Sequence, residues 1–417
     1  MNVEIINIGD ELLIGQVINT NASWMAEQLN LSGFRVYQFT VINDSHHHIL
    51  QALADAEARA EVVLISGGIG PTKDDITKHT LCEYFNTRLV FNEEAYRDVE
   101  ALFARRGYQM TELNRQQAEL PENCTGIQNK LGTARGMWFE KDRPGGGKTT
   151  FVSMPGVPFE MKAMMTDFVI PQLEQIFKTP FIYHKTVLTQ GVGESFLAAR
   201  IEDWENALPS NIKLAYLPQP GIVRLRLTGE GSDEEILHRQ VESEVLKLNA
   251  LIPEYIFGYD DETLELIIGR LLKERHATLA TAESCTGGTI AQMITSVPGS
   301  SAWFKGSVVA YSNEIKEEFL GVFRETLEKH GAISKEVVME MAISLQSKFN
   351  VDYAIATSGI AGPDGGTPEK PVGITWIAIA APDEVFAMQY FFGDSRERNI
   401  RRTALQALNL LRKKLQI

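Results

Sequence analysis

The stretch LATAESCTGGTIAQMI, residues 279–294, contains a change from strand to helix on which the fold assignment rests. Residues 277–282 are uncharged and mostly apolar, which is typical of a short buried strand. Two glycines follow, and the run behind them has the pattern of a helix. Ser284 and Cys285 therefore lie at a strand-to-helix turn, where two candidate nucleophiles stand side by side.

The same alternation of strand and helix occurs on both sides of this stretch. Near the start of the chain, strands are expected at 3–9, 34–42 and 61–68, with helices at 21–33, 47–59 and 75–86. Apolar strands between amphipathic helices predict a parallel sheet covered on both faces, with ligands beyond the carboxyl ends of the strands. We therefore predict an α/β protein with two α/β sandwich domains, at 1–175 and 260–417.

Residues 180–255 have a different pattern. A strand, a helix, a hairpin and a long helix predict a small α+β module, and this layout resembles an RNA-binding KH fold. A KH site needs a GXXG loop that holds the nucleic-acid backbone. The nearest stretch, GVGES at 191–195, lacks that loop. We expect a module that joins the two domains and supports a homodimer, without direct nucleic-acid binding.

Composition narrows the class of protein. The chain has 417 residues and a net charge of −14, which argues against broad electrostatic binding to nucleic acid. Its 3 cysteines are far apart, which favours a reducing compartment over a disulfide framework. The N-terminus is acidic where a signal peptide is basic, and no apolar run approaches the ~20 residues of a membrane span. These features predict a cytoplasmic protein that does not enter the membrane.

Two interpretations of Ser284 are open. A serine before a helix is often an N-cap that accepts backbone N–H groups. As a nucleophile, it would be helped by Gly287 and Gly288, whose N–H groups could face a phosphate or an oxyanion. A hydroxyl also needs a general base. The candidates are Tyr311 and Lys316, because a buried lysine with a lowered pKa can take a proton.

A glycine-rich loop, ATSGIAGPDGGTPEKPVG at 356–373, offers further polar groups. Thr357 and Ser358 stand at the end of the expected strand, where their hydroxyls could bind a polar substrate. Glycine-rich loops often allow a backbone to approach a ligand closely. Downstream, Arg398 and Arg402 share one helix face, so they could hold a phosphate or be surface arginines.

Four segments of the last region, AESCTGG, GSSAWFKGSVVAYSNEIK, HGAISKEVV and SGIAGPDGGTPEKPVG, resemble the CinA C-terminal family in order. The resemblance covers essentially all of 260–417. It implies a nicotinamide-nucleotide amidase, which hydrolyses nicotinamide mononucleotide to nicotinate mononucleotide and ammonia without a cofactor. The implied catalytic residues are Ser284, Tyr311, Lys316 and Ser358. The expected substrate-binding residues are Gly287, Gly288, Thr357, Gly359, Arg398 and Arg402, with Arg398 preferred over Arg396 and Arg402.

The first domain resembles the CinA N-terminal, molybdopterin-binding-like family through GDELLIGQVINTNA, SGGIGPTKDDITK, GTARG and MPGVPFEM. Some proteins with this domain are implied to be metal-dependent ADP-ribose pyrophosphatases. The expected diphosphate site is Gly67, Gly68, Gly70 and Thr72. The expected ligands of a divalent cation of unknown identity are the carboxylates of Asp10, Asp74 and Asp75.

The order of the three parts resembles that of full-length CinA. We therefore expect a cytoplasmic enzyme of pyridine-nucleotide salvage with two nucleotide-processing sites. The alternative is a pterin- or nucleotide-binding adaptor without catalysis in its N-terminal domain, linked to competence for DNA uptake. Release of ammonia from nicotinamide mononucleotide separates these possibilities.

Overall fold

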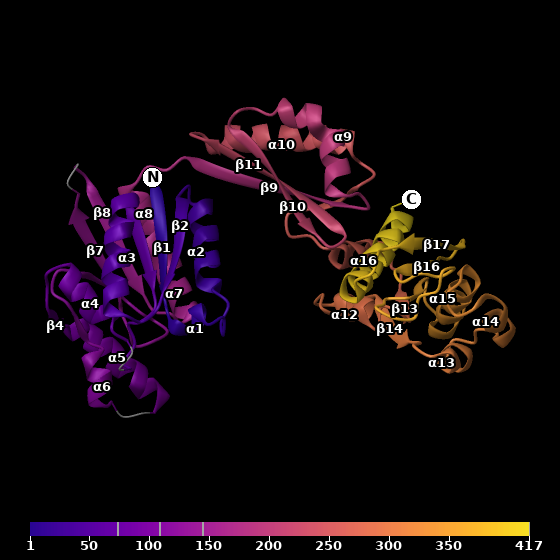
Figure 1. Ribbon diagram of the computed structural model, residues 1–417, viewed down its shortest axis with the longest axis horizontal. Helices are drawn as coiled ribbons and strands as arrows, with labels where there is room; N and C mark the ends of the chain where they lie inside the picture. The colour runs from indigo at the N-terminus through magenta and orange to yellow at the C-terminus, as the bar shows by residue number, and fades with distance from the viewer. Residues whose placement is uncertain (73–74, 108–109, 144–145, 417) are drawn as a thin grey trace. The chain divides into compact units, whose positions relative to one another are not determined.

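The computed structural model describes residues 1–72, 75–107, 110–143 and 146–416 (Figure 1). The chain divides into two compact units. The first is Met1–Tyr183 with Glu230–Leu237, and the second is His184–Gly229 with His238–Ile417. Strands and helices alternate along both, so the expected α/β class is confirmed.

A six-stranded sheet forms the centre of the first unit, in the order β2-β1-β3-β8-β7-β6. Its strands are β1 (Asn2–Ile8), β2 (Arg35–Ile42), β3 (Val62–Ser66), β6 (Thr125–Ile127), β7 (Gly136–Asp142) and β8 (Lys148–Met154). The first four strands of this order run parallel to one another, as expected. Strand β7 runs antiparallel to both of its neighbours, β8 and β6. The connection from β7 to β8 spans only 143–147, which is too short for a parallel crossover.

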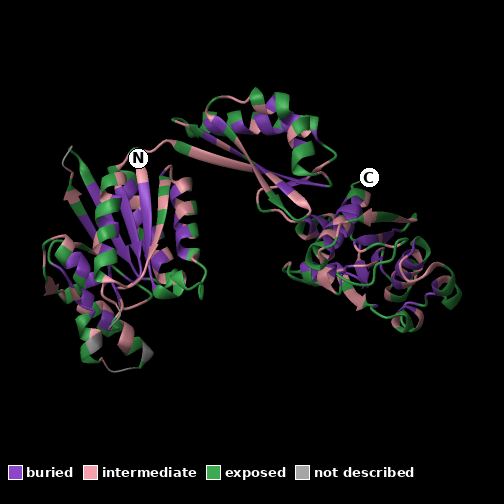
Figure 2. Cartoon of the chain, in the orientation of Figure 1, coloured by how far each residue is buried: buried purple, intermediate pink, exposed green. Residues whose placement is uncertain are grey.

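Helices cover both faces of this sheet, and Figure 2 shows its strands as the most buried part of the domain. On one face Ile6, Ile8, Val63 and Ile65 pack against the helices α3 and α4, and on the other Val3, Ile5 and Leu64 pack against α2, α7 and the turns after it. The helices are α1 (Asp10–Leu13), α2 (Thr20–Leu31), α3 (His46–Arg59), α4 (Thr77–Tyr84), α5 (Glu93–Arg106), α6 (Glu112–Gln116), α7 (Pro158–Met164) and α8 (Ile170–Ile176), with a π-turn at Met165–Val169 and a separate pair of strands, β4 (Leu89–Phe91) and β5 (Glu119–Pro121).

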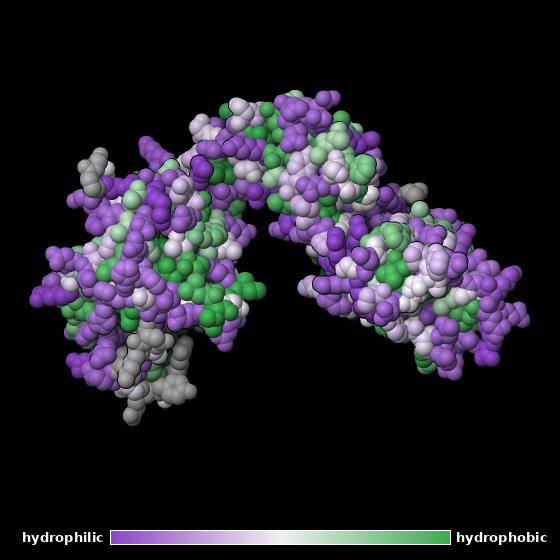
Figure 3. Space-filling model, in the orientation of Figure 1, coloured by the Kyte–Doolittle hydropathy of each residue, from purple (hydrophilic) through white to green (hydrophobic). Residues whose placement is uncertain are grey.

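Apolar side chains also lie exposed beside α1. Leu13, Ile14, Val17 and Ile18 are each more than half exposed. Figure 3 shows apolar atoms gathered on this side of the domain. Exposed apolar patches are typical of association surfaces.

The middle module has a four-stranded sheet in the order β10-β11-β9-β12. Its elements are β9 (Phe181–Gln190), α9 (Glu194–Asn206), β10 (Ile212–Gln219), β11 (Ile222–Gly231), α10 (Glu234–Leu251) and β12 (Ile256–Tyr259). The expected hairpin is β10 and β11, whose register runs from Ile212 opposite Gly229 to Gln219 opposite Ile222. The sequence interpretation did not include β12, which pairs with β9 and completes the sheet.

A five-stranded sheet with the order β14-β13-β15-β16-β17 forms the centre of the last domain. The strands are β13 (Leu279–Glu283), β14 (Phe304–Val309), β15 (Tyr353–Gly359), β16 (Ile374–Ala380) and β17 (Val385–Phe391). The helices are α11 (Leu264–Glu274), α12 (Thr289–Thr295), α13 (Asn313–Glu318), α14 (Arg324–His330), α15 (Lys335–Phe349) and α16 (Arg396–Leu415), with a 3₁₀ turn at Ser300–Ala302. Strand β13 is an interior strand of this sheet and runs parallel to both of its neighbours, β14 and β15.

The two faces of this sheet have different side chains. Isoleucine and leucine side chains from β13, β15 and β16 pack against α11, α12 and α16. The opposite face presents mainly alanine, which lets α15 approach closely. Loops at the carboxyl ends of β13 and β15 therefore rest on a rigid, covered sheet. Among the described residues, no helix is long and apolar enough to cross a membrane.

Candidate functional site

Ser284 follows the last residue of β13. Its N–H donates to the carbonyl of Thr357 on the neighbouring strand at 3.0 Å, which fixes the backbone of the turn. The side chain is 8% exposed. The turn then passes through Gly287 and Gly288, whose φ angles of 61° and 97° lie in the region that favours glycine. Helix α12 starts at the next residue.

A buried carboxylate, which the sequence interpretation missed, holds this turn. Glu283 has no exposed surface and ends an otherwise uncharged strand. It accepts hydrogen bonds from the N–H groups of Gly288 (3.0 Å), Ile290 (3.0 Å) and Ala291 (2.8 Å). It thus caps α12 and neutralises the positive end of the helix dipole. The sequence signal was a lone acid between a buried strand and a glycine turn.

Lys316 reaches Ser284 from α13. Its Nζ lies 3.2 Å from Ser284 Oγ and also donates to the carbonyl of Ala310 at 2.8 Å and that of Ser312 at 3.5 Å. No carboxylate is among these partners, and the side chain is 1% exposed. Burial lowers the pKa of this ammonium, because the charged form loses its hydration. A neutral amine beside a hydroxyl can accept the proton of that hydroxyl.

A cavity of about 180 Å³ opens beside this pair. Tyr311, Ser358 and Arg396 line it together with Ser284 and Lys316. One guanidinium nitrogen of Arg396 donates to the carbonyl of Gly362 at 2.7 Å, and another donates to the Tyr311 hydroxyl at 3.3 Å. The Ser358 hydroxyl donates to the carbonyl of Ala332 at 2.7 Å. The four expected catalytic side chains therefore lie around one cavity.

Several expected substrate-binding groups are otherwise engaged. The N–H of Gly287 donates to the carbonyl of Ser284, and that of Gly288 donates to Glu283. The Thr357 hydroxyl is buried against that of Thr286 at 2.8 Å. Gly359 lines the cavity, and a Cβ there would meet the carbonyl of Ile374 at 2.6 Å. In this structure these glycines serve the turn and strand packing, and their role in substrate binding stays a prediction.

The arginine at the cavity also differs from the expectation. Arg396, the first residue of α16, lines the cavity with Ser284. Arg398 and Arg402 instead line a separate opening formed with Pro218–Gly221. Successive helical residues are rotated by about 100°, so a shift of two positions moves a side chain to another face.

Cys285 contributes to the wall of the same cavity. Its side chain is buried, and burial raises the pKa of the thiol to about 12. A thiol in this state holds almost no thiolate near neutral pH, so it is a weak nucleophile. Ser284, by contrast, has the buried Lys316 amine within hydrogen-bond distance of its hydroxyl.

The N-terminal domain has its own cavity of about 460 Å³ at the carboxyl ends of β1, β3 and β8. Gly67, Gly68 and Gly70 line it, as expected, with Asp75 and Glu160. A Cβ at Gly67 would meet the carbonyl of Ile8 at 2.2 Å, so the loop needs glycine there. Arg135 of the GTARG segment is not in the wall, and it forms an ion pair with Asp98.

The expected metal ligands do not come together among the described residues. Asp74 lies outside the described ranges. Asp75 accepts hydrogen bonds from the N–H (2.9 Å) and the hydroxyl of Thr72, and neither Thr72 nor Asp10 lines the cavity. The described residues contain no group of three metal-ligating side chains. The predicted donor set is therefore incomplete among the described residues, and the metal stays a sequence prediction.

The His46–His48 run forms the first three residues of α3. His46 Nε2 lies 2.7 Å from a carboxylate oxygen of Glu83. The run is therefore part of the polar surface of a helix.

Comparisons with known proteins match the whole chain. Family models match at 4–175 ("Probable molybdopterin binding domain"), 184–258 ("Damage-inducible protein CinA KH domain") and 261–415 ("CinA C-terminal domain"). A CinA-like protein of Cytophaga hutchinsonii is 47% identical over 412 residues, which is 99% of this chain and 97% of that protein. One of Flavobacterium psychrophilum is 48% identical over 100% of this chain and 99% of its own length. Among solved structures, a CinA superfamily protein of Klebsiella pneumoniae is 34% identical over 36% of this chain and 95% of its own length, with a TM-score of 0.36.

Proposed function

Because this chain belongs to the CinA family, we propose that the Ser284–Lys316 cavity is a nicotinamide-nucleotide amidase site. The reaction is hydrolysis of nicotinamide mononucleotide to nicotinate mononucleotide and ammonia. One observation carries the proposal: a buried lysine amine, with no carboxylate among its hydrogen-bond partners in the described residues, lies 3.2 Å from a serine hydroxyl at the end of an interior strand. This arrangement is suited to acyl transfer.

In the first step, Ser284 Oγ attacks the carbonyl carbon of the nicotinamide amide. Neutral Lys316 takes the hydroxyl proton and then donates it to the departing nitrogen, so that the C–N bond breaks and ammonia leaves. The carboxamide becomes an ester on Ser284. In the second step, water attacks the ester carbon, Lys316 accepts a proton from that water and returns it to Ser284 Oγ, and nicotinate mononucleotide is released.

The developing oxyanion needs donors near the carbonyl carbon. The N–H groups of Ser284, Gly287 and Gly288 already have acceptors within the fold. Those of Cys285 and Thr286 donate to no backbone or carboxylate acceptor among the described residues, so they are the candidates for this role. Glu283 acts indirectly, because it holds the turn that orients them.

The substrate's phosphate is assigned to Arg396. A volume of about 180 Å³ is below the ~300–1,000 Å³ of sites for whole small ligands. The pyridine amide therefore enters the cavity, and the ribose phosphate lies toward Arg396 and Tyr311. A guanidinium can bind a phosphate through two parallel hydrogen bonds. This orientation places the amide, rather than the phosphate, against Ser284.

The test is turnover of nicotinamide mononucleotide by the purified chain. Ammonia and nicotinate mononucleotide should appear in equal amounts, and free nicotinamide should be a poor substrate because it lacks the phosphate. Asp75→Asn is the matched control, since Asp75 belongs to the other unit, and its amidase rate should equal that of the wild type. Absence of ammonia from a folded wild-type chain would favour the adaptor alternative.

A second candidate function is cleavage of ADP-ribose, or a similar diphosphate, in the N-terminal cavity. Its size of about 460 Å³ and its three glycines at the carboxyl end of β3 favour a nucleotide ligand. The test measures ADP-ribose cleavage with added divalent cation and with excess chelator. Asp75→Asn should lose this activity, and full activity in chelator would contradict the predicted metal. Binding without cleavage would leave this domain a nucleotide-binding module.

A further inference from the structure

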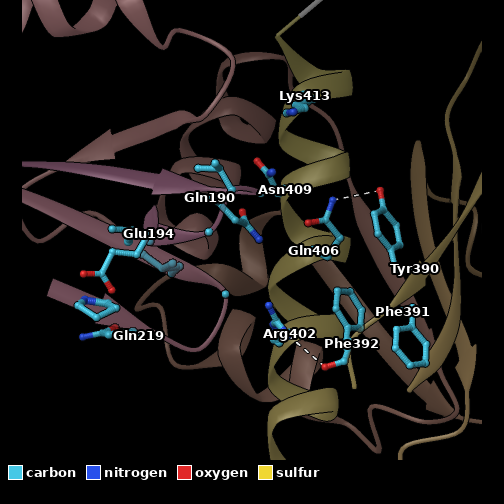
Figure 4. A pocket seen from close by; sticks show the side chains of 17 residues that line it. Gln190, Glu194, Gln219, Tyr390, Phe391, Phe392, Arg402, Gln406, Asn409 and Lys413 are labelled. Atoms are coloured by element: carbon cyan, nitrogen blue, oxygen red, sulfur yellow. Dashed lines mark hydrogen bonds between the residues drawn. The ribbon is translucent and has the colours of Figure 1, made fainter. Parts of the chain in front are cut away.

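A second cavity in the same unit lies between the middle module and the last domain. Its volume is about 440 Å³. The turn before α9 and the β10–β11 hairpin form one wall, and β17 and α16 form the other (Figure 4). The two walls are packed together, since Leu188 and Phe257 of the module belong to the apolar core that contains α11 and α16. This cavity is separate from the one at Ser284.

Aromatic rings cover one side of the cavity. Tyr390 and Phe392 are stacked, with ring centroids 5.7 Å apart and planes 5° from parallel. Phe391, which also lines the cavity, is 66% exposed. The Arg402 guanidinium lies over the Phe392 ring at 5.6 Å. Such a surface is suited to a flat aromatic ligand.

An unsatisfied amide faces this side. Gln190 is 4% exposed, and its Oε1 has no hydrogen-bond partner among the described residues. Figure 4 shows its side chain directed toward α16. A buried acceptor without a donor is costly, and a ligand N–H or O–H would relieve that cost. Gln406 supplies a further amide, which donates to the Tyr390 hydroxyl at 3.1 Å.

Positive groups lie at the same cavity. Arg402 uses one nitrogen to donate to the carbonyl of Phe392 at 3.1 Å, and a guanidinium has further N–H groups. Lys413 lines the cavity farther along α16 and is exposed. Gly193 precedes α9 at the cavity, and it has no side chain to cap the first N–H groups of that helix. The acidic Glu194 also lines the cavity, but Figure 4 shows its carboxylate directed away from α16.

We propose that this cavity binds a mononucleotide. A nucleoside monophosphate combines the three groups for which the walls are complementary: a flat base for the aromatic side, a hydrogen-bond donor for Gln190 Oε1, and a phosphate for Arg402 and Lys413. The volume is in the range of small-ligand sites, ~300–1,000 Å³. The site is independent of the proposed amidase chemistry, because no residue lines both cavities.

The experiment is calorimetric titration of the full chain with AMP, GMP, CMP and UMP as probes. Inorganic phosphate and adenosine are titrated separately to distinguish the contributions of the anion and the base. We expect at least one monophosphate to bind more tightly than either fragment. Arg402→Met and Gln190→Leu should each weaken that binding by about tenfold, the change expected when a hydrogen-bonding partner is lost.

Arg401→Met is the matched control, because Arg401 is an exposed arginine on the same helix that does not line the cavity. Its affinity should equal that of the wild type. Lys413→Met removes an exposed charge and provides a variant that folds if Gln190→Leu does not. Equal affinity in all variants, or equal affinity for phosphate and nucleotide, would overturn the proposal. So would binding of single-stranded RNA without binding of any mononucleotide.

Discussion

Two glycine loops in this chain follow a central strand in the same way and differ in what faces them. VVLISGGIGPTKDD (62–75) contains β3 and the loop after it, and YAIATSGIAGPDGG (353–366) contains β15 and the loop after it. Both loops line a cavity at the carboxyl end of their sheet. The loop after β15 faces a buried lysine and a serine supplied by other elements, whereas the loop after β3 faces carboxylates. The glycine pattern therefore predicts where a ligand lies, and the neighbouring elements decide the chemistry.

The carboxylates at the two loops also differ in burial. Glu283 is fully buried and accepts three backbone N–H groups, so it belongs to the structure of its turn. Asp75 is partly exposed, and among the described residues its carboxylate accepts hydrogen bonds from Thr72. A group in the position of Asp75 can change partners on ligand binding at small cost. A buried carboxylate in the position of Glu283 cannot change its hydrogen-bond partners at small cost.

The largest expected effect comes from removing Lys316, the proposed base that faces the loop after β15. Lys316→Met keeps most of the side-chain volume and removes the amine, so kcat for nicotinamide mononucleotide should fall by about 10³-fold or more. ADP-ribose cleavage, if present, should be unchanged. Steady-state kinetics on both substrates measures this. A Lys316→Met variant within tenfold of wild-type kcat would remove the distinction between the loops.

The next effect concerns the buried carboxylate. Glu283→Gln keeps the shape but places an amide NH₂ against backbone donors, so it should lower the free energy of unfolding by about 2–3 kcal/mol. Asp75→Asn, the matched change at the other loop, should cost less than about 1 kcal/mol because the site is exposed to water. Urea unfolding of the two variants makes the comparison. An equal decrease in the free energy of unfolding for the two variants would contradict the energetic difference that we attribute to burial.

Arg396→Met should raise KM about tenfold with a smaller change in kcat, because it removes a phosphate contact that is present before and during the reaction. Arg398→Met tests the position of this contact, since Arg398 lines a different opening. It should leave both parameters near wild type. A larger KM effect at Arg398 than at Arg396 would show that the phosphate leaves the cavity on another side.

The smallest effect is a pH dependence of stability. Burial lowers the pKa of Lys316, so between that lowered pKa and the unfolded value of about 10.4 the unfolded chain binds the proton and the folded chain does not. The free energy of unfolding therefore rises by about 1.4 kcal/mol for each pH unit within that window. Cys285 has the opposite sign, because its raised pKa makes folding less favourable above about 8.5.

The two contributions are separated in a Cys285→Ser background. Urea unfolding against pH should then show the rise with Lys316 present and no rise with Lys316→Met. If the free energies of unfolding with Lys316 and with Lys316→Met differ by the same amount at every pH, the Lys316 amine keeps its ordinary pKa in the folded chain.

The sequence predicted this arrangement in part. The resemblance implied that Ser284 of the strand-to-helix turn, Tyr311, Lys316 and Ser358 belong to one catalytic site, and the structure brings these residues together around one cavity. The role of the turn glycines in substrate binding stays a prediction, and a pattern of residues does not reveal that the Gly288 N–H donates to Glu283. Arg396 lines the cavity and the preferred Arg398 does not, because a shift of two residues in a helix changes the face; which arginine binds the phosphate stays a prediction. Strand β12 was missed, since four residues carry little periodicity.

The central claim is that Ser284, and not Cys285, is the nucleophile. The most direct test is kcat for nicotinamide mononucleotide in two single variants of the full chain, each checked for folding by thermal unfolding. We expect Ser284→Ala to lose several orders of magnitude in kcat and Cys285→Ala to keep most of the wild-type rate. A folded but inactive Cys285→Ala chain, or wild-type inactivation by a thiol-blocking reagent against which the substrate protects, would contradict it.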